Sequence, residues 1–385
     1  MKKIVSVLVF FILASASFAQ KKNSLLADFH RGNINDKIES VKKASENFDI
    51  SLLIQSLDFL CRADESLSEE DSFNQLAEIT IRSFNSRNSS GFEKQITEGL
   101  CKLFKISESN RIKAAVIDSF YNVPCADSVH IVNNYFYKKM QNHSQMDDVI
   151  IKAIKFMGEK GNSASFNRLF IADILEIWPE YTDIIQENYG NLADENRKEI
   201  LQMIVTVPAE KKVSILNKLK NNPKIPKKIC GECAENVLSS IINIEEENSK
   251  DSKKDVVSLE LICLEIIAES KWTRASSVTT SCFSRLRYEY EQGNITVEQF
   301  TKAIGNIASV AADNTVIVLS SYLDFLNKCT ENNQPPVKDV VLSVINSLGD
   351  LGDNKAFDFI YAATSLDYPS EIVDAAKSAI SKLKW

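Results

Sequence analysis

Apolar side chains recur along the chain at intervals of three and four residues, the spacing that gathers them on one face of an α-helix. The clearest stretch has them at Val337, Val340, Val341, Val344, Ile345 and Leu348. The same spacing returns at Ile372, Val373, Ala376, Ala379, Ile380 and Leu383. The period of two that marks a half-buried strand is absent from the first stretch. The pattern therefore predicts amphipathic helices that bury one face.

One helical pattern is repeated far along the chain. Residues 148–158 (DVIIKAIKFMG) align without a gap on residues 339–349 (DVVLSVINSLG), and the match continues through Gly161 with Gly352 and Phe166 with Phe357. Weaker copies near Val116, Ala303 and Ala379 lie 35 to 41 residues from the neighbouring copies. A period of this length is what a repeat of two helices needs.

The ends of the repeated helix carry turn signals. Pro335 and Pro336 precede it, where a missing amide proton costs little, and Gly349 and Gly352 flank its end, where we expect a left-handed residue. Asp353 then supplies a side chain suited to capping the next helix. Only 11 glycines and 8 prolines occur in 385 residues, and this scarcity of turn formers favours helices joined by short connections.

Together these features resemble HEAT repeats and the wider armadillo-like superfamily. The resemblance is clearest over 147–170 and 336–383, plausible over 109–140 and 297–329, and faint before residue 95. Tetratricopeptide repeats are the alternative among helical solenoids, but the sequence lacks their tryptophan, glycine-tyrosine and alanine spacing. The resemblance implies an all-α fold, a right-handed α-solenoid of stacked antiparallel helix pairs, and it implies a shape rather than an activity.

The first twenty residues have the features of a secretory signal peptide: Lys2 and Lys3, an apolar stretch over 4–13, and Ser17-Phe18-Ala19 before Gln20. The apolar stretch is shorter than the ~20 residues of a membrane-spanning helix. No cysteine follows the small residues, as a bacterial lipoprotein would require. We expect cleavage after residue 19 and a periplasmic or secreted bacterial protein, with no transmembrane segment in the mature chain.

A charged run at 245–255 (EEENSKDSKKD) interrupts the helical pattern. It is predicted either to link an N-terminal repeat segment, 20–244, to C-terminal repeats at 256–385, or to be a long loop within one continuous array. The net charge of −7, without basic clusters, argues against nucleic acid and anionic membranes as partners. Protein partners in the cell envelope are expected instead.

Few residues suggest chemistry. Cys230 and Cys233 form a CxxC pair, a spacing that suits thiol exchange, but a thioredoxin-like motif expects a preceding strand and this pair has helical flanks. The pair is predicted to be a structural disulfide or a buried pair rather than a redox or metal site. The other cysteines fall mostly among apolar residues and are predicted to be small buried side chains: Cys61, Cys101, Cys125, Cys263, Cys282 and Cys329.

Catalysis is not expected. The three histidines, His30, His130 and His143, lie far apart, which leaves little material for a triad or a metal cluster. No phosphate-binding loop or nucleophile elbow occurs. The sequence therefore predicts a protein that is not an enzyme and has no cofactor or metal.

Two aromatic clusters are candidate partner contacts, because tyrosine and arginine are favoured at interfaces. They comprise Tyr135 and Tyr137, and Arg285, Arg287, Tyr288 and Tyr290. The competing interpretation places these side chains in the core. The function that follows is an exported, non-catalytic protein-interaction scaffold or adaptor. The alternatives are a thiol-redox factor that uses Cys230 and Cys233, or a binder of a small envelope ligand such as a peptide or glycan.

Overall fold

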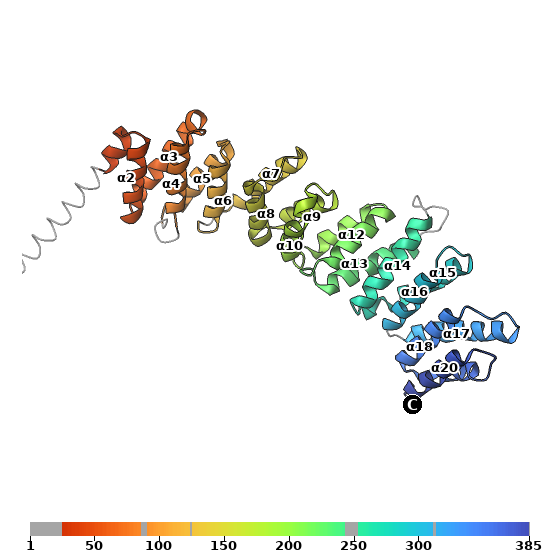
Figure 1. Ribbon diagram of the computed structural model, residues 1–385. Helices are drawn as coiled ribbons and strands as arrows, with labels where there is room; N and C mark the ends of the chain where they lie inside the picture. Colours follow the sequence, from red (N-terminus) through yellow and green to blue (C-terminus); the bar gives the residue numbers. More distant parts are fainter. Residues whose placement is uncertain (1–24, 86–90, 124, 243–252, 311–312, 385) are drawn as a thin grey trace, which may run out of the picture. The chain divides into compact units, whose positions relative to one another are not determined.

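The computed structural model describes residues 25–85, 91–123, 125–242, 253–310 and 313–384 (Figure 1). The predicted signal peptide lies outside these ranges. The described chain is helical and forms no β-strand, apart from one isolated parallel bridge between Asp353 and Lys384. None of the described helices combines the length and the hydrophobicity that crossing a bilayer requires.

The chain divides into two compact units, Met1–Tyr189 and Gly190–Trp385. The first contains α2 (Ile34–Glu46), α3 (Ile50–Leu67), α4 (Asp71–Ser83), α5 (Glu93–Ile106), α6 (Asn110–Phe120), α7 (Ser128–Gln141), α8 (Asp148–Lys160) and α9 (Ser163–Ile174). The boundary falls within α10 (Thr182–Leu192). The second contains α11 (Arg197–Thr206), α12 (Ala209–Asn221), α13 (Lys227–Ile242), α14 (Lys253–Glu269), α15 (Ser276–Glu291), α16 (Val297–Ser309), α17 (Asp313–Glu331), α18 (Lys338–Leu351), α19 (Phe357–Ala363) and α20 (Ser370–Lys382).

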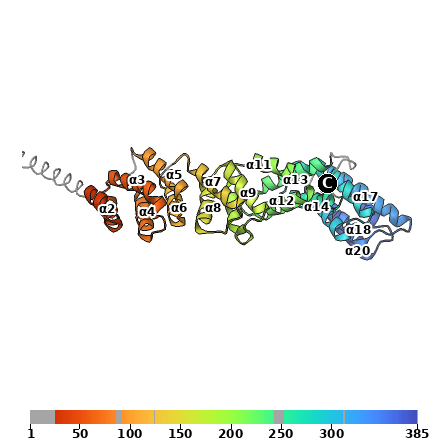
Figure 2. The same cartoon turned by 90° about the horizontal axis from the view of Figure 1, so that it is seen from above.

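Each unit consists of two layers of stacked helices. In the first unit α2, α4, α6 and α8 pack in series, and so do α3, α5, α7 and α9, which gives the two rows seen from above in Figure 2. In the second unit the series are α12, α14, α16, α18 and α20 in one layer and α11, α13, α15, α17 and α19 in the other. Since each helix packs on the next helix but one, the predicted all-α solenoid of helix pairs is confirmed, and the chain is a helical-repeat protein.

Polar contacts between neighbouring repeats join residues that are separated by about one repeat length in the sequence. The indole Nε1 of Trp178 donates to the carbonyl oxygen of Ser144, 34 residues earlier, at 2.8 Å. In the second unit the indole Nε1 of Trp272 donates to Glu235 Oε2, 37 residues earlier, also at 2.8 Å. Both tryptophans directly precede a short 3₁₀ turn. Each tryptophan thus ties its repeat to the preceding one, Trp178 through a backbone carbonyl after α7 and Trp272 through a carboxylate on α13.

The glycines of the repeated pattern have two different roles. Gly352 ends α18 with a φ of 68°, the left-handed conformation predicted for it. The prediction for Gly349 is wrong, because this residue lies inside α18, where a Cβ atom would stand 2.8 Å from the Cβ of Ala379 on α20. The aligned Gly158 lies inside α8 and meets Asn188 in the same way. These two glycines allow a neighbouring helix to approach closely.

The charged run predicted at 245–255 lies mostly outside the described residues. Its last three residues, 253–255, belong to the first turn of α14. The helices on either side of the run, α13 and α14, pack against each other within the second unit. The division between compact units falls at Tyr189 and Gly190 rather than at this run.

Candidate functional site

An open groove lies between α15 and α17 in the second unit, with a volume of about 460 Å³. We call it the α15–α17 groove. Its lining is Phe283, Ser284, Arg287, Tyr288, Glu291, Ile317, Val318, Ser321 and Tyr322. The two helices are successive members of one layer, so the groove is the hollow between neighbouring repeats.

Large apolar side chains are exposed around this groove. Tyr288 is 53% exposed, Ile317 is 56% exposed, and Phe325, one turn beyond Ser321 on α17, is 42% exposed. Single exposed apolar residues are common on soluble proteins, whereas a group of them around a hollow is typical of an interaction site.

Arg287 is held in place at the centre of the groove. Its Nε donates to Glu291 Oε1 at 2.7 Å. Its guanidinium lies 4.7 Å from the ring centroid of Tyr322 and 4.5 Å from that of Phe325, within the range of cation–π attraction. An arginine already held against aromatic rings loses little conformational freedom on binding, which suits it to be an interface anchor.

The other predicted contacts on α15 are divided between surface and interior. Arg285 forms an ion pair with Glu260, with its Nε 2.8 Å from Glu260 Oε1, and Glu260 on α14 is only 1% exposed. Tyr290 stacks on Phe300 with ring centroids 4.5 Å apart, and burial raises its pKa. The structure therefore brings Arg287 and Tyr288 to the groove, while Arg285 and Tyr290 pack on neighbouring helices.

The aromatic pair on α7 is divided in the same way. Tyr135 packs edge-on against Phe104 at 5.4 Å, and burial raises the pKa of its hydroxyl. Tyr137 is 39% exposed, accepts a hydrogen bond from Gln141 at 2.8 Å, and has the guanidinium of Arg168 at 5.0 Å from its ring centroid. Only Tyr137 of this pair has an exposed ring.

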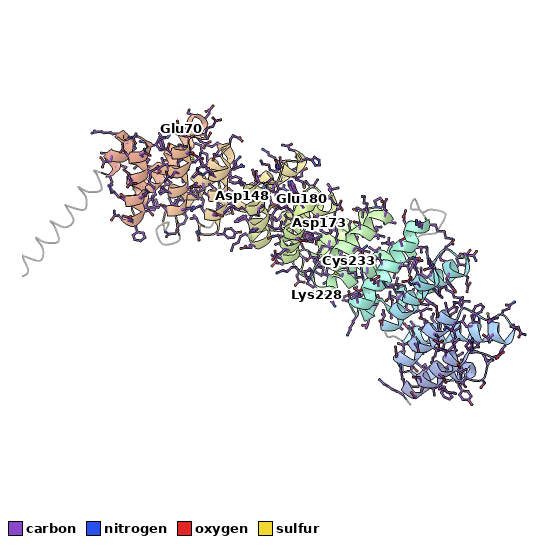
Figure 3. All side chains as sticks on the ribbon, viewed as in Figure 1. Glu70, Asp148, Asp173, Glu180, Lys228 and Cys233 are labelled. Carbon is purple, nitrogen blue, oxygen red and sulfur yellow. The ribbon has the colours of Figure 1, made fainter. Side chains whose placement is uncertain are left out.

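Cys230 and Cys233 lie buried in the first half of α13, the helix on which Figure 3 labels Cys233. No disulfide joins them in the described structure. Burial raises the pKa of Cys230 to about 11, and it raises that of Cys233 as well. Burial and the raised pKa values both disfavour the thiolate that exchange chemistry needs.

A different cysteine pair, which the sequence analysis did not single out, lies close together. The Sγ atoms of Cys101 on α5 and Cys125 before α7 are 3.2 Å apart. The two residues are 24 positions apart in the chain, so no short sequence motif indicates that they are in contact. The described ranges contain no cluster of three or more side chains suited to hold a metal ion.

Comparisons with known proteins give no family for this chain. No protein-family profile matches it, and no curated protein matches its sequence. Among solved structures it is similar to human Puf-A in complex with DNA, with 10% sequence identity and a TM-score of 0.27, over 94% of this chain and 95% of the other.

The exclusion of nucleic acid as a partner needs correction, because this similar structure is a protein–DNA complex. The exclusion rested on net charge, which averages over the whole surface and does not describe one face of it. Lys94, Lys102 and Lys105, for example, line a single cavity of this acidic protein. A similarity with a TM-score of 0.27 does not itself assign DNA binding to this chain.

Proposed function

We propose that this protein is an exported, non-catalytic interaction scaffold of the bacterial cell envelope, which holds a protein partner in the α15–α17 groove. The observation that carries the proposal is the group of exposed apolar side chains, Tyr288, Ile317 and Phe325, around a stacked Arg287. The repeats are assigned to the HEAT type on the match between 148–158 and 339–349. Export is inferred from the signal-like first twenty residues.

The physical argument is the balance between burial and ordering. Covering apolar surface stabilises a complex by about 25 cal/mol per Å². Interface anchors are effective when little conformational freedom is lost on binding, and Arg287 is already fixed by Glu291 and two aromatic rings. The buried Cys230 and Cys233 give a catalytic or redox role no comparable support.

The test is a pull-down from the native envelope that compares the wild-type protein with the double variant Tyr288→Ser, Ile317→Ser. This variant removes two exposed apolar side chains of the groove. We expect the wild-type protein to recover one protein in stoichiometric amount. The amount recovered by the double variant should be at least tenfold lower. The matched control replaces two equally exposed apolar residues of the first unit, Phe48→Ser and Leu175→Ser, which are 63% and 61% exposed.

Three outcomes would contradict the proposal. The first is no stoichiometric protein on wild type. The second is equal recovery by the groove variant and by the control. The third is recovery of bound material that nuclease digestion removes from the wild-type protein, since the partner would then be nucleic acid. Circular dichroism of both variants checks that the helices are retained.

A further inference from the structure

The thiols of Cys101 on α5 and Cys125 before α7 lie in direct contact. Their Sγ atoms are in hydrogen-bond contact at 3.2 Å. A disulfide has its sulfurs about 2.05 Å apart, so a movement of roughly 1 Å would bring the pair to bonding distance. A change of side-chain torsion can supply such a movement without displacing a helix.

The pair also lies where a small molecule can reach it. Both cysteines line an open cavity of about 460 Å³. Cys101 is buried and Cys125 is half-buried, so Cys125 is the more accessible residue of the pair. Three lysines, Lys94, Lys102 and Lys105, face the same cavity, together with Glu98 and Asp127.

The surroundings favour a thiolate at Cys125. The hydrogen bond between the two thiols, aided by the backbone amides of Asp127 and Ser128 at the start of α7, lowers the pKa of Cys125. The same hydrogen bond, together with burial, raises the pKa of Cys101. At Cys230 and Cys233, by contrast, burial raises the pKa of both thiols.

We propose that Cys101 and Cys125 are a reversible dithiol–disulfide couple, in which Cys125 attacks a small-molecule disulfide from the cavity and Cys101 closes the ring. This is a site on the first unit, independent of the α15–α17 groove. It differs from the Cys230 and Cys233 pair.

The chemistry balances as two exchange steps. The Cys125 thiolate bonds to one sulfur of the external disulfide, and the other sulfur leaves as a thiolate that takes up a proton. Cys101 then loses its proton to water and attacks the Cys125 sulfur of the mixed disulfide, and the second external thiolate leaves and is protonated. The protein gives up two electrons and two protons, and the external disulfide becomes two thiols.

The first test uses oxidised and reduced glutathione as the probe on the purified full-length protein. After equilibration and alkylation, trypsin places Cys101 in peptide 95–102 and Cys125 in peptide 114–138. Mass spectrometry is expected to find these two peptides joined, in a proportion that rises with the oxidised fraction of glutathione and disappears with dithiothreitol. Cys329→Ala, a half-buried cysteine of the second unit, is the matched control and leaves this result unchanged.

Single variants then identify the attacking sulfur. In Cys101→Ala the mixed disulfide of Cys125 with glutathione accumulates, because no second thiol displaces it. In Cys125→Ala, Cys101 gains little glutathione. The pH of half-maximal Cys125 alkylation is expected to lie below that of an ordinary thiol in the wild type and to rise in Cys101→Ala, whereas Cys101→Ser, which keeps a donor, restores part of the difference.

The proposal is overturned if folded protein in oxidised glutathione shows no joined 95–102 and 114–138 peptides. It is also overturned if peptide 44–62, which carries Cys61, joins either of them as often. Equal glutathione uptake by the two single variants would contradict the assigned order. Circular dichroism of each variant establishes that these readings come from folded protein.

Discussion

At the scale of single residues, helix geometry separates side chains that are neighbours in sequence. Arg285 and Arg287 are two positions apart, and residues at this spacing face different sides of a helix. Arg285 accordingly reaches Glu260 on α14, while Arg287 reaches Tyr322 and Phe325 on α17. Tyr288 and Tyr290 are separated in the same way, because Tyr288 is exposed whereas Tyr290 stacks on Phe300.

Arg285 is expected to matter for stability rather than for binding. Replacing it in Arg285→Met removes the ion pair that it makes with the buried Glu260 carboxylate, and breaking a buried pair in this way costs about 3–5 kcal/mol. Urea unfolding followed by circular dichroism measures the loss. The control is Lys328→Met, which breaks an exposed pair with Asp324 and should have little effect on stability.

A further replacement separates charge burial from packing. Adding Glu260→Leu to Arg285→Met removes the buried carboxylate as well and is expected to recover much of the lost stability. If Arg285→Met costs no more than Lys328→Met, then the pair with Glu260 does not stabilise the fold.

At the scale of helices, the sequence predicts where helices form better than how they pack. The three–four spacing in 337–348 and 372–383 predicts α18 and α20 correctly, because this order of apolar residues places them on one face that a helix can bury. The prediction for Gly349 is wrong because glycine occurs both at helix ends and where helices cross closely. Only the nearby Ala379 on α20 shows that Gly349 has the second role. The Cys101 and Cys125 contact was missed for the same reason, since it depends on how α5 packs beside the start of α7.

The close approach of α18 and α20 gives a matched pair of substitutions. Gly349→Ala forces the new methyl group against the Cβ and Cα atoms of Ala379, at 2.8 and 2.9 Å, and overpacking of this kind costs about 1–3 kcal/mol. Gly305→Ala in α16 meets nothing within 4 Å and should stabilise the protein by about 0.5–1 kcal/mol, because alanine favours a helix interior. Thermal unfolding of the two variants should move in opposite directions, and a shift in the same direction would contradict this packing argument.

At the scale of the whole molecule, stability is expected to be local. In each unit the packing described joins neighbouring helices of the two layers, so a repeat protein of this kind approximates a chain of nearest-neighbour interactions. The sequence could predict such an array from one repeated pattern, 148–158 and 339–349. It could not predict the division at Tyr189 and Gly190, because the charged run at 245–255 is a stronger signal in composition than anything at that boundary.

Local stability leads to a prediction for hydrogen exchange. Because Gly349→Ala weakens only the contact between α18 and α20, amide exchange should accelerate in α16 to α20 and remain unchanged in α2 to α8. Mass spectrometry of peptides from both units measures this, with Gly305→Ala as the control that slows exchange in α16 and its neighbours. Equal acceleration throughout the chain would instead mean that both units unfold as one cooperative body, since only a global opening can transmit a local clash to helices that do not touch it.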